Sequence, residues 1–170
     1  MKDERVVTVP VVNRKRLEGV LTVSDITDSF MEAYDSEILS TAHTRYCNIV
    51  DTLEGKLLIG DEKAYYTKGK VLVAAANPDL MESYISKHDL VILGNRYESQ
   101  LCAIEMEADC IVVCEGAPVS LTIRKLAQER GCTVISTPFD TFTAARFINQ
   151  SMPISYFMRR DPVSYTHLRA

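Results

Sequence analysis

From residue 70 onward, short apolar runs alternate with stretches whose apolar residues recur at helical spacing. The runs are residues 71–75, 90–93, 110–113 and 133–136, each too short to be a buried helix. Runs of this length that are rich in β-branched residues, or bounded by polar and glycine turns, are typical of buried strands. Their alternation with helices predicts an α/β fold for residues 71–150, with a parallel sheet covered by helices on both faces and right-handed crossovers.

Helix signals lie between these runs. Asn77-Pro78-Asp79 predicts a helix start, Gly131 predicts a left-handed helix end, and Asp140 predicts the N-cap of a last helix. The expected apolar faces are, in chain order, Leu80, Met81, Tyr84 and Ile85; Val119, Ile123, Leu126 and Ala127; and Phe142, Ala145 and Ile148.

The first 33 residues have a different pattern. Strands at 7–12 and 17–23, joined by the polar turn 13–16, predict a hairpin, and a helix is expected to begin near Ser24 or Asp25. The side chains expected to point inward from that helix are those of Ile26, Phe30 and Met31. Because a hairpin and one helix are too small to bury a core of their own, we expect either that a part is missing or that a further element packs on them.

Residues 34–70 connect these two regions and are less regular. They predict a short helix and then a strand leading into the sheet, from the apolar residues Ile49, Leu53, Leu57, Leu58 and Ile59.

Composition and charge narrow the function classes. The 170 residues are 46% hydrophobic, which is enough for a sizeable core, and the formal charge is −4 with a pI near 5.4. This charge favours neither nucleic acid nor an anionic membrane as a partner.

The N-terminal Met1–Arg5 carries acidic residues and no apolar run approaches 18 residues, so a cytoplasmic protein is expected. The five cysteines form no Cys-x-x-Cys pair and are interpreted as packing residues.

Two strings near the N-terminus carry a family resemblance. Val9-Pro10-Val11-Val12, followed after a turn by Gly19-Val20-Leu21-Thr22-Val23-Ser24-Asp25-Ile26, resembles the second half of a CBS repeat. The resemblance implies a nucleotide site at a helix start, where Thr22 lies near a phosphate and Asp25 holds the ribose hydroxyls. A helix cap at Ser24 and Asp25 is the alternative, and both roles can coexist.

A second resemblance covers the predicted sheet. Residues 70–150, above all the string 134–146 (Val-Ile-Ser-Thr-Pro-Phe-Asp-Thr-Phe-Thr-Ala-Ala-Arg), resemble a DRTGG domain, and Ser151-Met152-Pro153-Ile154 resembles the opening of another CBS repeat. The order CBS, DRTGG, CBS is similar to the regulatory insert of clostridial-type family II inorganic pyrophosphatases. The limits expected from this are 1–33, partial first CBS repeat; 34–70, connection; 71–150, DRTGG core; 151–162, start of the second CBS repeat; and 163–170, non-native tail. Truncation is expected at both ends.

Two positions depart from the DRTGG pattern. The Asp-Arg of the family name is Asn95-Arg96 here, and its Thr-Gly-Gly falls on Cys114-Glu115-Gly116. A carboxylate in place of a glycine hinders the approach of an anion to this loop. Ligands gather at the carboxyl ends of parallel strands, so the possible anion or interface residues are those that follow strands: Asn77, Asn95, Arg96, Ser136 and Thr137. Arg96 is the best anion ligand of this set, unless it caps a carbonyl or pairs across a dimer.

No catalytic machinery is identified in the chain. Family II pyrophosphatases hold manganese or cobalt with clusters of His and Asp, whereas His43, His88 and His167 lie far apart and lack His-x-Asp or Asp-His-His spacing. The resemblance implies a regulatory region that senses AMP, ADP or ATP, attached to the catalytic domains of a diphosphate-hydrolysing parent. A homodimer is expected because the incomplete CBS hairpin leaves apolar residues without their usual partners, namely Val9, Val11, Val20, Leu21 and Phe30. The alternatives are a ligand-free oligomerisation module and a regulatory domain of a phosphate acetyltransferase-type enzyme.

Overall fold

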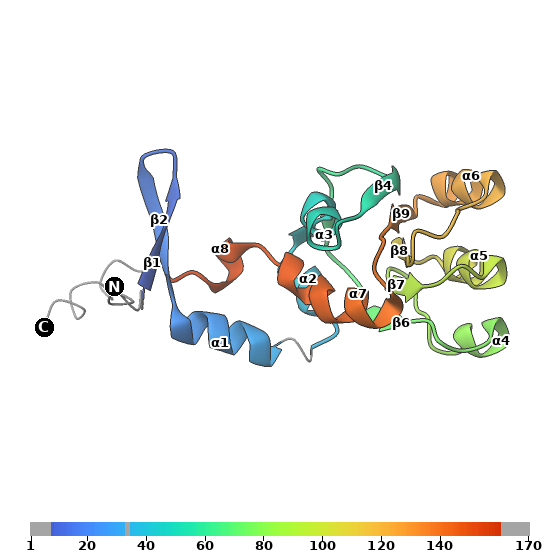
Figure 1. The fold of residues 1–170 in the computed structure, drawn as a ribbon, viewed down its shortest axis with the longest axis horizontal. Helices are drawn as coiled ribbons and strands as arrows, with labels where there is room; N and C mark the ends of the chain where they lie inside the picture. The colour runs from blue at the N-terminus through green and yellow to red at the C-terminus, as the bar shows by residue number, and fades with distance from the viewer. Residues whose placement is uncertain (1–7, 33–34, 161–170) are drawn as a thin grey trace, which may run out of the picture. The chain divides into compact units, whose positions relative to one another are not determined.

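The computed structural model describes residues 8–32 and 35–160, with the side chains of residues 30–32 left out. Contacts divide the chain into two compact units (Figure 1). The larger unit is residues 35–152, and the smaller one combines the N-terminal residues up to 34 with the residues from 153 onward. Val7, the side chains of Phe30 and Met31, His167 and the expected tail 163–170 lie outside the described residues.

The larger unit is built on a five-stranded sheet of order β4-β9-β8-β7-β6. Its strands are β4 (Lys56–Ile59), β6 (Val71–Val73), β7 (Leu90–Leu93), β8 (Cys110–Val113) and β9 (Thr133–Ser136). Strands β6 to β9 run parallel, as predicted, and three of them have the predicted bounds. The strand expected to lead into the sheet is β4, which pairs antiparallel with β9 at the edge.

Helices cover both faces of this sheet (Figure 1). One face carries α4 (Pro78–Met81), α5 (Tyr97–Glu105) and α6 (Leu121–Arg130). The other carries α3 (Tyr46–Thr52), α7 (Thr141–Phe147) and the 3-10 turn η1 (Ile148–Ser151). The single-turn helix α2 (Ile38–Thr41) and the small pair β3 (Thr44–Arg45) and β5 (Tyr65–Tyr66) complete the unit. The predicted fold class is confirmed.

The core follows from the alternation of side chains along the strands. Val91 and Leu93 of β7 pack in one cluster with Ile123 of α6, and all three are fully buried. Leu90 and Ile92 point to the opposite face because successive strand residues alternate, and they are equally buried. Strands buried on both faces read as continuous apolar runs, which is why their bounds could be predicted.

The helix caps largely match expectation. Asp140 accepts a hydrogen bond from the Thr143 amide, as expected of an N-cap, and Gly131 ends α6 with φ of 70°. Ser120, which was not predicted, caps α6 by accepting from the Ile123 amide. Asn77 occupies the N-cap position of α4 without a side-chain hydrogen bond.

Two expected inward-facing residues are exposed, Leu80 by 59% and Phe142 by 71%. Helix α4 is a single turn in which Met81 alone is buried, and in α7 the buried position is Ala144 rather than Phe142. The other residues predicted for these faces fit better, since Met81, Ile85 and Ile148 are buried. A helix of one or two turns gives too few apolar positions to fix its buried face.

The smaller unit contains an antiparallel hairpin of β1 (Thr8–Asn13) and β2 (Arg16–Thr22), followed directly by α1 (Val23–Glu32). The short helix α8 (Ile154–Phe157) leads to a β-bridge between Val20 and Arg159. The expectation that a further element packs on the hairpin is confirmed, because Val20 is only 7% exposed. Ile26, expected to point inward, is 40% exposed. Helix α1 contacts β2 and α8 of the same unit.

Candidate functional site

Thr22 and Asp25 are joined at the start of α1 by reciprocal hydrogen bonds. The Asp25 amide donates to the Thr22 hydroxyl over 3.2 Å, while Asp25 Oδ2 accepts from the Thr22 amide and from the Thr22 hydroxyl, each at 2.7 Å. This arrangement is a capping box, in which residues three apart satisfy each other's backbone groups. The cap is therefore Thr22, two or three positions before the caps expected at Ser24 or Asp25, because β2 runs into α1 without a loop.

Arg159 is the third residue of this cluster. Its Nε donates to Asp25 Oδ1 over 3.0 Å, and its backbone exchanges hydrogen bonds of 3.1 and 3.0 Å with Val20. Gly19 allows this approach, because a Cβ there would lie 2.8 Å from Met158 Sδ and 2.9 Å from the Arg159 carbonyl oxygen. Arg159 was not among the residues expected from the sequence, since it lies 134 positions from Asp25 and no local pattern links the two.

The surroundings keep the Asp25 carboxyl ionised. Asp25 is only 8% exposed. Burial raises the pKa of this carboxyl, but the hydrogen bonds from Thr22 and the charge of Arg159 outweigh burial and bring the pKa below its ordinary value. The start of a helix also favours negative charge. The cluster is therefore a fixed anionic acceptor beside a cation whose side chain is 53% exposed.

The residues expected at the strand ends are not brought together as one site. Asn95 and Arg96 are exposed between β7 and α5, where Arg96 holds the N-cap position without a side-chain cap. Thr137 is fully buried. Its hydroxyl donates to the Leu53 carbonyl over 2.6 Å and accepts from the Phe139 amide over 3.1 Å.

The loop Cys114-Glu115-Gly116 follows β8 and is tied to the neighbouring loop after β9. The Glu115 amide donates to the Phe139 carbonyl and the Gly116 amide to the Thr137 carbonyl, both over 2.8 Å. Glu115 has φ of 61° and Gly116 of 60°. Since both amides already have backbone partners, this loop does not present them to an anion.

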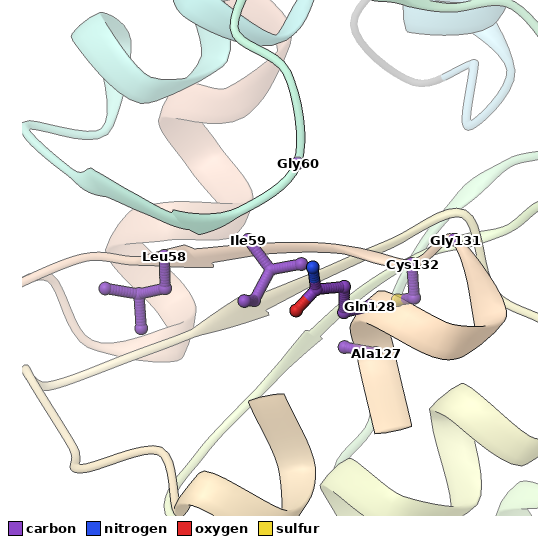
Figure 2. Close-up of a pocket in the computed structure, with 7 residues that line it drawn as sticks. All are labelled: Leu58, Ile59, Gly60, Ala127, Gln128, Gly131 and Cys132. Carbon is purple, nitrogen blue, oxygen red and sulfur yellow. The ribbon is translucent and has the colours of Figure 1, made fainter. Parts of the chain in front are cut away.

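A cavity of about 400 Å³ lies between β4 and the end of α6 (Figure 2). Its lining residues are Leu58, Ile59, Gly60, Ala127, Gln128, Gly131 and Cys132. Because Cys132 immediately precedes β9, the cavity lies at the amino ends of the parallel strands, opposite the end where Asn95 and Thr137 lie. No sequence pattern indicated it.

The described residues contain neither a metal-binding cluster nor a membrane span. No group of three His, Cys, Asp or Glu side chains within 8–32 and 35–160 is arranged to hold a metal ion. None of the helices described is long and apolar enough to cross a bilayer. His88 instead pairs with Asp109 over 2.9 Å, and all five cysteines are free.

Residues 48–151 match the family model of the DRTGG domain. This chain belongs to the DRTGG family. The match includes most of α3 and all of β4 as well as the predicted core 71–150, while the compact unit extends over 35–152. The limits drawn from the sequence for the five segments stay predictions.

The DRTGG chain is also similar to longer proteins. It is 38% identical over 162 residues to the cobalt-dependent inorganic pyrophosphatase of Clostridium perfringens, an alignment that covers 95% of this chain and 30% of that protein. It is 28% identical over 160 residues to the probable manganese-dependent inorganic pyrophosphatase of Thermotoga maritima, covering 94% of this chain and 29% of that protein. The chain thus spans less than a third of the length of these relatives.

A solved structure resembles both units of the DRTGG chain. It is the crystal structure of the CBS and DRTGG domains of the regulatory region of Clostridium perfringens pyrophosphatase, complexed with its activator diadenosine tetraphosphate. The TM-score is 0.86 at 34% identity, and the match covers 99% of this chain and 78% of that one. The resemblance to the CBS and DRTGG insert, inferred above from short strings, is confirmed.

Proposed function

We propose that this chain is an adenine-nucleotide-sensing regulatory region of an inorganic pyrophosphatase. The observation that carries the proposal is the ionised, buried carboxylate of Asp25, held by Thr22 at the start of α1. The similarity to a regulatory region complexed with diadenosine tetraphosphate supports it.

The proposed roles follow from the chemistry of the cluster. The ionised Asp25 accepts hydrogen bonds from the ribose hydroxyls of the nucleotide, and the Thr22 hydroxyl lies toward a phosphate. The amino end of α1 adds a partial positive charge, which favours an anionic ligand. Regulation then requires that the nucleotide bind two conformations of the parent protein with different affinity, and such coupling is typically about 1 to 3 kcal/mol.

Diphosphate hydrolysis and its metal belong, in this proposal, to catalytic domains of the parent protein. The names of the relatives specify cobalt and manganese, and the residues described here offer no cluster for either ion. Asn95 and Arg96 remain proposed contacts to an anion or to a partner subunit, because both are exposed at a strand end. Thr137 is left out of this proposal, because it is fully buried and its hydroxyl, amide and carbonyl all have partners within the protein. A cytoplasmic location is also proposed, supported by the five free cysteines.

Self-association as a homodimer is part of the same proposal. The hairpin exposes Val9 by 47%, Val12 by 60% and Leu17 by 51%. Exposed apolar patches favour association. Sedimentation of wild type and a Val12→Lys variant at tens of micromolar tests this, with a dimer expected for the wild type and a weakened dimer for the variant. A wild-type monomer would contradict it.

NMR of the protein's backbone amides tests the nucleotide proposal on this chain. Titration with AMP to millimolar concentrations measures even weak binding, and GMP is the control for adenine preference. We expect saturable shifts of the Thr22 and Asp25 amides with AMP and smaller shifts with GMP. Equal shifts with both nucleotides, or shifts confined to other residues, would refute the proposed site.

A further inference from the structure

The Asp25 carboxylate has too few acceptor positions for all the donors the proposed site needs. An ionised carboxylate offers about four lone-pair positions, two on each oxygen. The Thr22 amide and hydroxyl both donate to Oδ2, and Arg159 Nε donates to Oδ1. One position is left, whereas a ribose binding through both neighbouring hydroxyls needs two. Ribose binding must therefore displace a donor that the carboxylate already has.

The donor that yields most readily is Arg159. The two Thr22 bonds fix the start of α1, so removing either one unravels the cap. The Arg159 side chain is 53% exposed, so water can solvate its guanidinium when it leaves Asp25. Its backbone, in contrast, is fixed by both hydrogen bonds to Val20, two residues before Thr22. A displaced guanidinium therefore stays beside the amino end of α1.

We propose that Arg159 determines whether this site prefers phosphorylated or unphosphorylated nucleosides. When the ribose hydroxyls bind the Asp25 carboxylate, the Arg159 guanidinium leaves Asp25 and binds the phosphate of the ligand. The inference rests on the proposed function, because it uses the same ribose contact at Asp25. When a nucleotide binds, its phosphate replaces the Asp25 carboxylate as the charged partner of Arg159. For a nucleoside without phosphate, Arg159 is only a competitor for Oδ1.

The chemistry predicts effects of opposite sign when the guanidinium is removed. In Arg159→Gln, adenosine no longer competes with an ion pair, so its affinity should rise about two- to fivefold, the scale of a weak ion pair. AMP loses a charge-assisted bond to its phosphate, so its affinity should fall about tenfold. Arg159→Lys keeps the charge and should restore part of the preference for AMP. A merely structural role of Arg159 would weaken both ligands together.

The experiment is an NMR titration of the chain with adenosine and with AMP, for wild type, Arg159→Gln, Arg159→Lys and Arg160→Gln. Arg160 is exposed and adjacent, so its variant removes the same charge away from Asp25. A selective fall in the AMP-to-adenosine preference of Arg159→Gln supports the inference. Parallel changes for both ligands, no change, or the same change in Arg160→Gln would overturn it. If the wild type binds neither ligand, the proposed function itself fails.

Discussion

Thr137 and Leu53, 84 positions apart, are joined by a hydrogen bond of 2.6 Å from the Thr137 hydroxyl to the Leu53 carbonyl. Both residues are fully buried. Leu53 follows α3 and Thr137 follows β9, so the bond ties a covering helix to the central sheet of the larger unit. The hydroxyl also accepts from the Phe139 amide, which positions the loop before α7.

Replacing Thr137 by valine should therefore destabilise the larger unit. The substitution leaves a buried carbonyl and a partly buried amide without their partner, which costs about 1 to 3 kcal/mol. Denaturant unfolding of Thr137→Val measures this loss, and Thr122→Val, at an exposed position of α6, is the control. Equal stability of the two variants would show that the bond to Leu53 contributes nothing.

Glycine at position 115 should stabilise the protein. Glu115 has φ of 61°, a left-handed conformation that costs a residue with a side chain about 1 to 2 kcal/mol. We expect Glu115→Gly to raise the free energy of unfolding by about 1 kcal/mol, less the entropy cost of a glycine. The same change at Glu129, exposed within α6, should lower it by about 1 kcal/mol. Effects of the same sign at both positions would contradict the argument.

Gly19 is expected to control the pairing between β2 and Arg159. An alanine Cβ at position 19 would lie 2.9 Å from the Arg159 carbonyl oxygen, a backbone atom that can move only if the bridge shifts. Gly19→Ala should therefore speed hydrogen exchange of the Val20 amide, which donates to that carbonyl. At Gly94 an added Cβ meets no atom within 4 Å, so Gly94→Ala is the control. Unchanged protection of Val20 would show that the close approach tolerates a side chain.

Asp25 should make the stability of the smaller unit depend on acid pH. Burial opposes ionisation, but Thr22 and Arg159 lower the pKa of Asp25 in the folded protein. Its contribution is then fully present above the unfolded pKa of about 3.9 and is lost as the pH falls through the lower folded pKa. Between pH 6 and pH 2 the free energy of unfolding of this unit should fall less in Asp25→Asn than in the wild type. Parallel curves would contradict this.

The sequence predicted best what local patterns determine. The bounds of β7, β8 and β9 were correct because apolar runs buried on both faces end sharply at polar turns. Helix α5 was not identified, since two of its buried residues, Ser99 and Gln100, are polar and interrupt the apolar period.

Long-range relationships were beyond the reach of the sequence. The direction of β4 depends on its pairing with β9, for example of Lys56 with Ser136, and not on its own composition. Thr22 and Asp25 could be singled out by their spacing, whereas Arg159 could not. Its approach to Asp25 depends on the absence of a side chain at Gly19 and on the backbone pairing with Val20.

The central claim is that an adenine nucleotide binds through the Asp25 carboxylate. Calorimetric titration with diadenosine tetraphosphate, for wild type, Asp25→Asn and Asp28→Asn, tests it most directly. An asparagine at position 25 can still accept from the Thr22 amide, so α1 should survive, and Asp28 is an exposed carboxylate on the same helix. A charge-assisted hydrogen bond is worth about 1.5 to 3 kcal/mol, so the affinity of Asp25→Asn should fall about 10- to 150-fold, with Asp28→Asn unchanged. Equal affinities in all three proteins would leave Asp25 as a helix cap and contradict the account.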